Sequence, residues 1–66
     1  MNYIVLEAQT NGNTTATLID TFSDLNLAES KYHLVLSAAA VSQVQKHTAA
    51  LIDETGLCIK SQCYEH

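Results

Sequence analysis

The sequence contains no arginine, tryptophan or proline, and its three lysines stand against seven acidic residues, giving a net charge of −4. Proteins that bind a nucleic acid backbone use clusters of arginine and lysine to replace its counterions. We therefore expect no binding to DNA or RNA. No apolar run approaches the ~20 residues of a membrane-spanning helix, and the first residues do not form a charged segment followed by an apolar one. We expect a cytoplasmic protein without a membrane partner.

Cysteine is also scarce, with only Cys58 and Cys63 in the chain. Both fall in one expected strand, where ~3.3 Å per residue places their Cα atoms about 16 Å apart, whereas a disulfide requires about 7 Å or less. Two free thiols agree with a reducing compartment. The three histidines (His33, His47 and His66) and the cysteines do not have the spacing of a zinc site. No nucleophile motif is present either, so we predict no metal, no cofactor and no catalytic residue.

The chain has 66 residues, of which 47% are hydrophobic and 15% are charged. This length makes one domain, residues 1–66. A domain of this size buries only about 60% of the surface of its unfolded chain, and designed soluble surfaces carry roughly 25–35% charged residues. Because small domains are often stabilised by oligomerisation, we expect other copies of the chain to cover part of its apolar surface.

Residues 26–42 (NLAESKYHLVLSAAAVS) have the composition of a helix and lack Gly and Pro. Asn26 and Glu29 match a capping box at its start. One apolar stripe follows helical spacing: Ala28, Tyr32, Val35, Leu36 and Ala39. A second, weaker stripe lies beside it and is a candidate contact between copies: Leu27, Leu34, Ala38 and Val41.

Four segments show the alternation or the β-branched residues of strands: residues 2–9, 14–22, 46–53 and 57–64. Asn11-Gly12 predicts a hairpin turn between the first two strands. Residues 53–56 predict a second turn, in which Gly56 takes a positive φ. The predicted fold is therefore α+β with the order ββαββ, a four-stranded antiparallel sheet with the helix on one face.

The first strand alternates between two sides, with Tyr3, Val5, Glu7 and Gln9 on one of them. We expect Ile4, Leu6 and Ala8 to face the helix. An apolar spot then remains on the opposite face, and packing against another subunit would hide it. Together with the second helical stripe, this spot defines the predicted oligomer interface: Tyr3, Val5, Leu34, Ala38, Val41 and Leu51.

Polar residues provide candidates for a small-ligand site between copies. Lysines repeated by symmetry converge on an anion as point charges, neutral side chains near the first turn supply hydrogen bonds, and a tyrosine stacks on a base. The candidate residues are Gln9, Thr10, Asn11, Lys31, His47, Lys60 and Tyr64. The alternative is that these are ordinary solvated residues of strands and turns.

Three stretches carry a resemblance: YIVLEAQTN-G at the start, AESKYHLVLSAAAVS in the middle and H-x-x-x-LIDETG-x-x-I-K-x-x-x-Y at the end. With them the chain resembles short uncharacterised proteins encoded by bacteriophages and by prophages of gut bacteria. The resemblance implies a protein that works in the host cytoplasm by occupying something of the host's. Some phage proteins of similar size form oligomers that sequester nucleotide immune signals between subunits.

Two hypotheses follow. In the first, the chain is a phage-encoded homo-oligomeric binding protein with an anti-defence role that sequesters a small host molecule, such as a nucleotide-derived immune signal. In the second, it is a protein–protein interaction module that inhibits a host protein or acts as a virion accessory factor. The second hypothesis uses the same apolar surface but needs no ligand pocket. We do not expect an enzyme.

Overall fold

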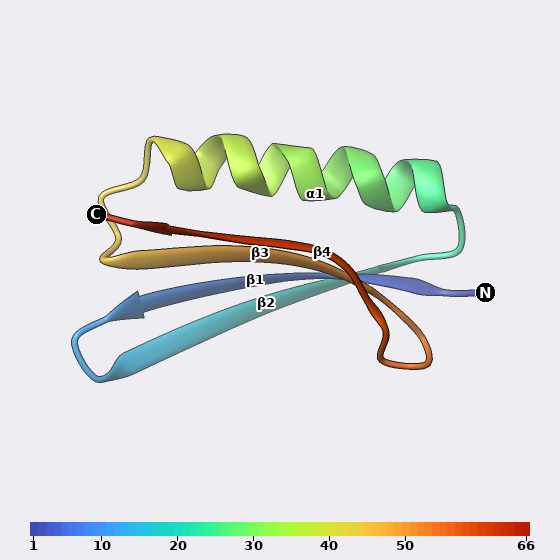
Figure 1. The fold of residues 1–66 in the computed structure, drawn as a ribbon, viewed down its shortest axis with the longest axis horizontal. Helices are drawn as coiled ribbons and strands as arrows, with labels where there is room; N and C mark the ends of the chain where they lie inside the picture. The colour runs from blue at the N-terminus through green and yellow to red at the C-terminus, as the bar shows by residue number, and fades with distance from the viewer.

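The computed structural model describes all 66 residues. In chain order it contains β1 (Tyr3–Asn11), β2 (Thr14–Phe22), α1 (Leu25–Ala40), β3 (Lys46–Asp53) and β4 (Cys58–Glu65). The strands form one antiparallel sheet in the order β2-β1-β3-β4. The helix covers one face of this sheet and no element covers the other face (Figure 1). The predicted α+β fold with ββαββ order is confirmed.

The first hairpin turns at Gly12 and Asn13, between strands that pair from Asn11–Thr14 onward. Gly12 has a φ of 60° and no residue other than glycine has a positive φ, which is the pattern of a type II′ turn. The backbone N–H of Gln45 donates to Asn11 Oδ1 at 3.1 Å, and Gln45 Oε1 accepts from Gly12 N at 2.8 Å. The turn is therefore fastened to the segment that follows the helix.

The second hairpin has the predicted turn at residues 53–56. Gly56 has a φ of 91°, and its N–H donates to Asp53 O at 3.0 Å. Asp53 Oδ1 accepts from the hydroxyl and the N–H of Thr55 and from Leu57 N. These hydrogen bonds hold the pKa of Asp53 below its ordinary value of 3.8, and the bond from the Thr55 hydroxyl has the largest effect.

The helix begins differently from the prediction. Asp24, in an extended conformation, is the N-cap and its carboxylate accepts from Asn26 N at 2.8 Å. The predicted capping box from Asn26 to Glu29 is therefore wrong. Aspartate caps a helix as well as asparagine does, and its charge also favours the positive end of the helix dipole. Glu29 is left free to bind Lys60, with 2.7 Å between Oε2 and Nζ.

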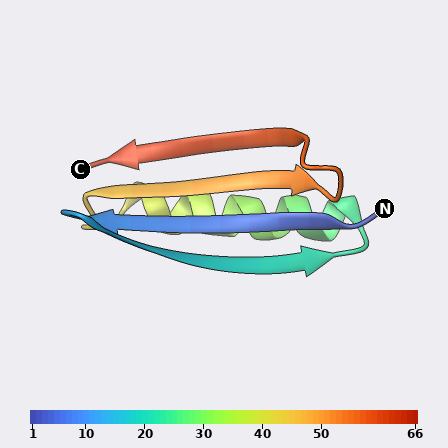
Figure 2. The same ribbon diagram turned by 90° about the horizontal axis from the view of Figure 1, so that it is seen from below.

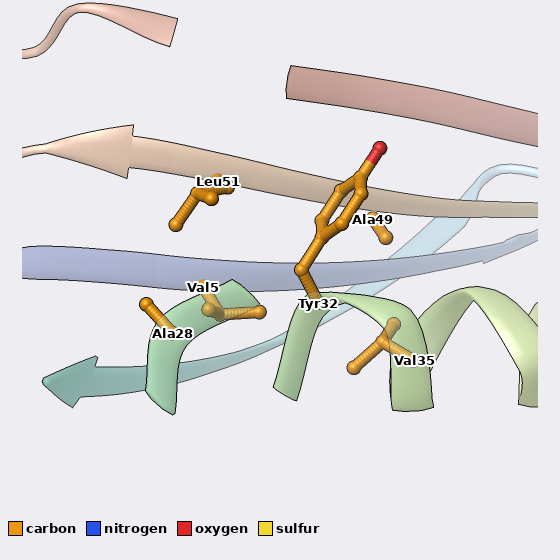
Figure 3. Close-up of a cluster of buried hydrophobic side chains, with 6 residues drawn as sticks. All are labelled: Val5, Ala28, Tyr32, Val35, Ala49 and Leu51. Atoms are coloured by element: carbon orange, nitrogen blue, oxygen red, sulfur yellow. The ribbon is translucent and has the colours of Figure 1, made fainter. Parts of the chain in front are cut away.

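The core lies between α1 and the two central strands. The first predicted stripe supplies the buried helix residues Ala28, Tyr32, Val35 and Ala39. Ala28, Tyr32 and Val35 pack on the buried strand residues Val5, Ala49 and Leu51 (Figure 3). The ring of Tyr32 crosses β3 toward β4, and burial raises the pKa of its hydroxyl.

The predicted orientation of the sheet is wrong. Val5 is 2% exposed, Leu51 is fully buried and Tyr3 packs against the same cluster, so these side chains face the helix. Since side chains alternate along a strand, Ile4, Leu6 and Ala8 face away from it. Both sets are apolar, and the alternation of β1 alone does not distinguish them.

Two ion pairs fix the helix above the sheet. Lys31 binds Asp20 of β2 at 3.3 Å, and on the opposite side Glu29 binds Lys60 of β4 at 2.7 Å. The helix therefore lies over β1 and β3, with one side directed toward each edge strand (Figure 2). No helix in the structure has the length and apolar character needed to cross a membrane.

Candidate functional site

A buried histidine–glutamate pair lies under the C-terminal half of α1. His47 of β3 is 4% exposed, and its Nε2 lies 2.6 Å from Glu7 Oε2 of β1. Gln9 Nε2 donates to the same Glu7 oxygen at 3.1 Å. Burial of a charged group is costly unless it is paired. These contacts therefore identify a specific polar cluster on the helix side of the sheet.

The other ring nitrogen of His47 has no partner. Nδ1 is buried and makes no hydrogen bond. Because Glu7 accepts a hydrogen bond, Nε2 carries a proton, and Nδ1 is either a lone acceptor in the neutral ring or a lone donor in the charged ring. A buried polar atom without a partner costs about 1–3 kcal/mol. This atom is therefore a local weakness of the fold and a distinctive feature of the cluster.

The last residues of the chain close the same end of the molecule. Tyr64 lies beside His47 in the register of β3 and β4. Its ring stacks on His66, with 6.4 Å between centroids and 10° between planes. His66 Nε2 lies 2.9 Å from Ala39 O at the end of α1, a carbonyl that also accepts from Ser42 N. These contacts tie β4 to the C-terminus of the helix.

The structure brings together three of the predicted ligand residues. Gln9, His47 and Tyr64 occupy paired positions on β1, β3 and β4 and share the helix face. The sequence indicates each of them for a separate reason, and only the sheet order makes them neighbours. Whether they bind a ligand stays a prediction.

The structure places the remaining four predicted ligand residues elsewhere. Thr10 points to the other face, where its hydroxyl lies 2.9 Å from that of Thr15, and Asn11 accepts from Gln45 N in the first turn. Lys31 and Lys60 are engaged with Asp20 and Glu29 on opposite sides of the helix. The lysines of one chain therefore do not converge on the histidine cluster.

The single chain has no cavity. No group of three or more His, Cys, Asp or Glu side chains is arranged to hold a metal ion. Cys58 and Cys63 are free thiols on the surface. A small-molecule site is typically a concave, largely apolar pocket. The single chain shows no pocket of this kind.

The predicted oligomer interface divides into two groups. Val5 and Leu51 lie in the core and Tyr3 is packed against it, so the prediction that these three are available on the outer face is wrong. On the helix, Leu34 and Val41 are 64% and 83% exposed, and Ala38 is exposed as well. Their role as an interface stays a prediction.

The surface that the sequence did not identify is the side of the sheet away from α1, here called the open face. Its centre is apolar: Ile4, Leu6, Ala8, Ile19, Ala50 and Ile52. The only charged side chains on the strands of this face are Lys46 and Glu65, which occupy opposite strand positions at one end. One feature of the sequence indicates this face. Lys46, Thr48, Ala50 and Ile52 lie on the side of β3 opposite His47, and the ring of His47 has a buried polar partner on the helix side.

No known protein family, curated protein or solved structure matches the chain.

Proposed function

We propose that this protein is a self-associating protein-interaction module, in which copies pack through the open face and the assembly engages a protein of the host or of the virion. The observation that supports this proposal is the open face itself. An uncovered sheet face is normally polar on its solvent side, whereas Ile4, Leu6 and Ile52 occupy the centre of this one. Contiguous apolar surface of this kind is typical of interaction sites.

A second copy is the occupant that fits the open face. The centre carries no charge, so two copies bring no like charges together there. Ala8 and Ala50 have short side chains and lie beside the larger side chains of Leu6 and Ile52 on this face. Four strands ~4.8 Å apart and about 27 Å long present about 500 Å² per copy. Two copies therefore bury about 1,000 Å², the lower limit for a specific interface.

Light scattering coupled to size-exclusion chromatography tests the open face. At micromolar concentration we expect the wild-type chain to have a multiple of the monomer mass. Ile52→Lys places a charge in the centre of the face, and we expect it to reduce that mass by at least half. Gln62→Lys is the matched control, because Gln62 is an exposed strand residue on the opposite face. A wild-type monomer, or an Ile52→Lys assembly of unchanged mass, contradicts the proposal.

A second candidate function is sequestration of a small host molecule between copies. The adjacency of Gln9, His47 and Tyr64 favours it, because these side chains supply hydrogen bonds and an aromatic ring from three neighbouring strands. The Glu7 carboxylate lies in the same cluster and repels a phosphate-rich ligand. This arrangement favours a ligand that presents hydrogen-bond donors, such as a nucleobase.

Titration calorimetry of the assembled protein with cyclic nucleotides and ADP-ribose derivatives tests this second function. We expect Tyr64→Ala to weaken binding at least tenfold, while the mass of the assembly stays the same. Thr15→Ala, on the opposite face, serves as the control. Absence of heat with every compound, from a protein shown to be folded and assembled, contradicts small-molecule sequestration and leaves the interaction module in place.

A further inference from the structure

The two edge strands of the sheet differ in how they are protected. β2 pairs with β1 over nine residues without interruption, and every residue before Phe22 is exposed. Its only charged residue is Asp20. β4 carries Lys60 and Glu65, and its register shifts near Leu51 and Ile52 of β3. Charges and bulges are the devices that keep an edge from pairing with another strand, and β2 has neither along most of its length.

The free hydrogen-bonding groups of β2 can be located from its pairing. The two-residue turn makes Asn11 and Thr14 a hydrogen-bonded pair, and such pairs alternate along an antiparallel ladder. Thr15, Thr17, Ile19 and Thr21 therefore direct their N–H and C=O groups away from β1. No other element of the chain pairs with this edge.

The helix adds apolar surface above the same edge. Lys31 reaches Asp20 of β2, so it marks the side of α1 that faces this strand. Leu27 precedes Lys31 by four positions and Leu34 follows it by three, which places both on that side. They are 58% and 64% exposed, and Leu18 below them on β2 is 63% exposed. We call the edge of β2 and these three leucines the β2 flank.

The opposite flank of the helix is already filled. Tyr32 extends toward β4 (Figure 3), Tyr64 is half-buried and Leu36 packs against the core. Glu29 and Lys60 close this side with an ion pair. Leu25, four positions before Glu29, is 39% exposed on this flank, whereas the two most exposed leucines of α1, Leu27 and Leu34, lie beside the edge that lacks protection.

We propose that the β2 flank joins two copies of the chain about a two-fold axis, with their β2 strands antiparallel and Leu18 at the axis. Leu18 is the central residue of the nine-residue strand, so this register pairs all nine positions. It also makes Leu18 and its symmetry mate a non-hydrogen-bonded pair, in which side chains approach most closely. The two sheets become one, with both helices on the same side and the leucines of each facing the other.

Charge and size fit this contact. Asp20 comes to lie opposite Ala16 of the other copy, and the two Asp20 residues lie four strand positions apart, about 13 Å, which exceeds the screening length of about 8 Å at physiological salt. The Cα atoms extend over 35 × 21 × 15 Å. A strand about 30 Å long under a helix layer presents about 600 Å² per copy, so two copies bury about 1,200 Å², as a stable interface requires.

The β2 flank and the open face are different surfaces, and the proposed two-fold contact does not depend on packing through the open face. If both contacts form, the assembly contains four copies or more. If only one forms, it is a dimer whose interface the variants identify.

Disulfide trapping tests the proposed register. In a Cys58→Ser, Cys63→Ser background, Leu18→Cys places two thiols at the axis, where Cα atoms of a non-hydrogen-bonded pair are ~4.5 Å apart and within disulfide range. We expect mild oxidation to convert most of the protein to a covalent dimer. Thr14→Cys is the matched control, because two copies of this position lie about 27 Å apart in the same register. It should remain unlinked.

Light scattering supplies the second measurement. Leu18→Lys points to the helix side and leaves the open face unchanged, and we expect it to halve the mass of the assembly. Circular dichroism checks that the variant is folded. The proposal is overturned if Leu18→Cys links no better than Thr14→Cys, or if Leu18→Lys leaves the mass unchanged. If only Ile52→Lys halves the mass of the assembly, the β2 contact is overturned and the open-face contact is retained. If only Leu18→Lys halves the mass, the open-face contact is overturned and the β2 contact is retained.

Discussion

The covered face of this sheet contains ionisable side chains, whereas the centre of its uncovered face is apolar. The face under α1 is covered, yet it contains the ionisable groups Glu7, His47 and Asp53. The open face has no covering layer, yet its centre consists of Ile4, Leu6, Ala8, Ala50 and Ile52. One helix cannot bury both faces of a sheet, so one face of this four-stranded sheet stays uncovered within a single chain.

The covered face also concentrates the folding energy in few side chains. Six buried residues form its core, and two of them are alanines. A domain of this size has a free energy of unfolding of about 3–10 kcal/mol. Each large side chain of the core therefore carries a substantial share of the stability. The open face contributes less to an isolated chain because its side chains remain partly in water.

Truncating equivalent side chains on the two faces gives the largest expected contrast. Leu51→Ala removes a fully buried side chain, and we expect a loss of about 2–5 kcal/mol in the free energy of unfolding. Ile52→Ala, the next residue on the open face, should cost about 1 kcal/mol or less in the monomer. Urea denaturation at low protein concentration measures both. Equal losses would show that the open face is packed within one chain.

Removing the carboxylate of the polar cluster is expected to have the next largest effect. Glu7→Ala leaves both ring nitrogens of buried His47 without a partner, and we expect a loss of about 1–3 kcal/mol. Glu65→Ala is the control, since Glu65 is exposed at the end of the open face, and it should change stability by about 0.5 kcal/mol or less. Similar values for both variants would mean that the pair at Glu7 contributes nothing specific.

Asp53 makes the stability of the covered face depend on pH. Its pKa in the folded chain lies below the ordinary value of 3.8, chiefly because of its hydrogen bond to the Thr55 hydroxyl. The ionised carboxylate therefore stabilises the fold fully above that ordinary value, and the contribution is lost as the pH falls through the lower folded pKa. We expect Asp53→Asn to lower the melting temperature near neutral pH and to flatten its decline in acid. A parallel decline in both proteins would contradict this role.

The ion pairs at the rim of the helix should matter least. Lys60→Met removes the partner of Glu29 while keeping the length of the side chain. Partly exposed pairs contribute about 0.2–1 kcal/mol, and salt reduces that contribution. Denaturation at low and high salt measures it, with Lys46→Met as the control at an exposed position. A larger loss that salt does not diminish would assign Lys60 to packing rather than to charge.

Some residues of the candidate site can be recognised from the sequence, and others only from the structure. His47 is a candidate from sequence because its strand alternation places it on the predicted second sheet face, and Tyr64 because a tyrosine ring can stack on a base. Glu7 was not identified, because nothing within β1 distinguishes it from a solvated glutamate. Its partner lies 40 positions away along the chain. Only the antiparallel pairing of β1 with β3 places the two side chains together.

Local chemistry was sufficient to predict the order of elements. The alternation of β3, the composition of α1 and the glycines at positions 12 and 56 each act within a few residues. The tertiary structure decided which face of the sheet the helix covers, because β1 and β3 are apolar on both faces and their alternation permits either choice. It also decided that Asp24 caps the helix, and that Tyr3, Val5 and Leu51 stabilise the core instead of forming an interface.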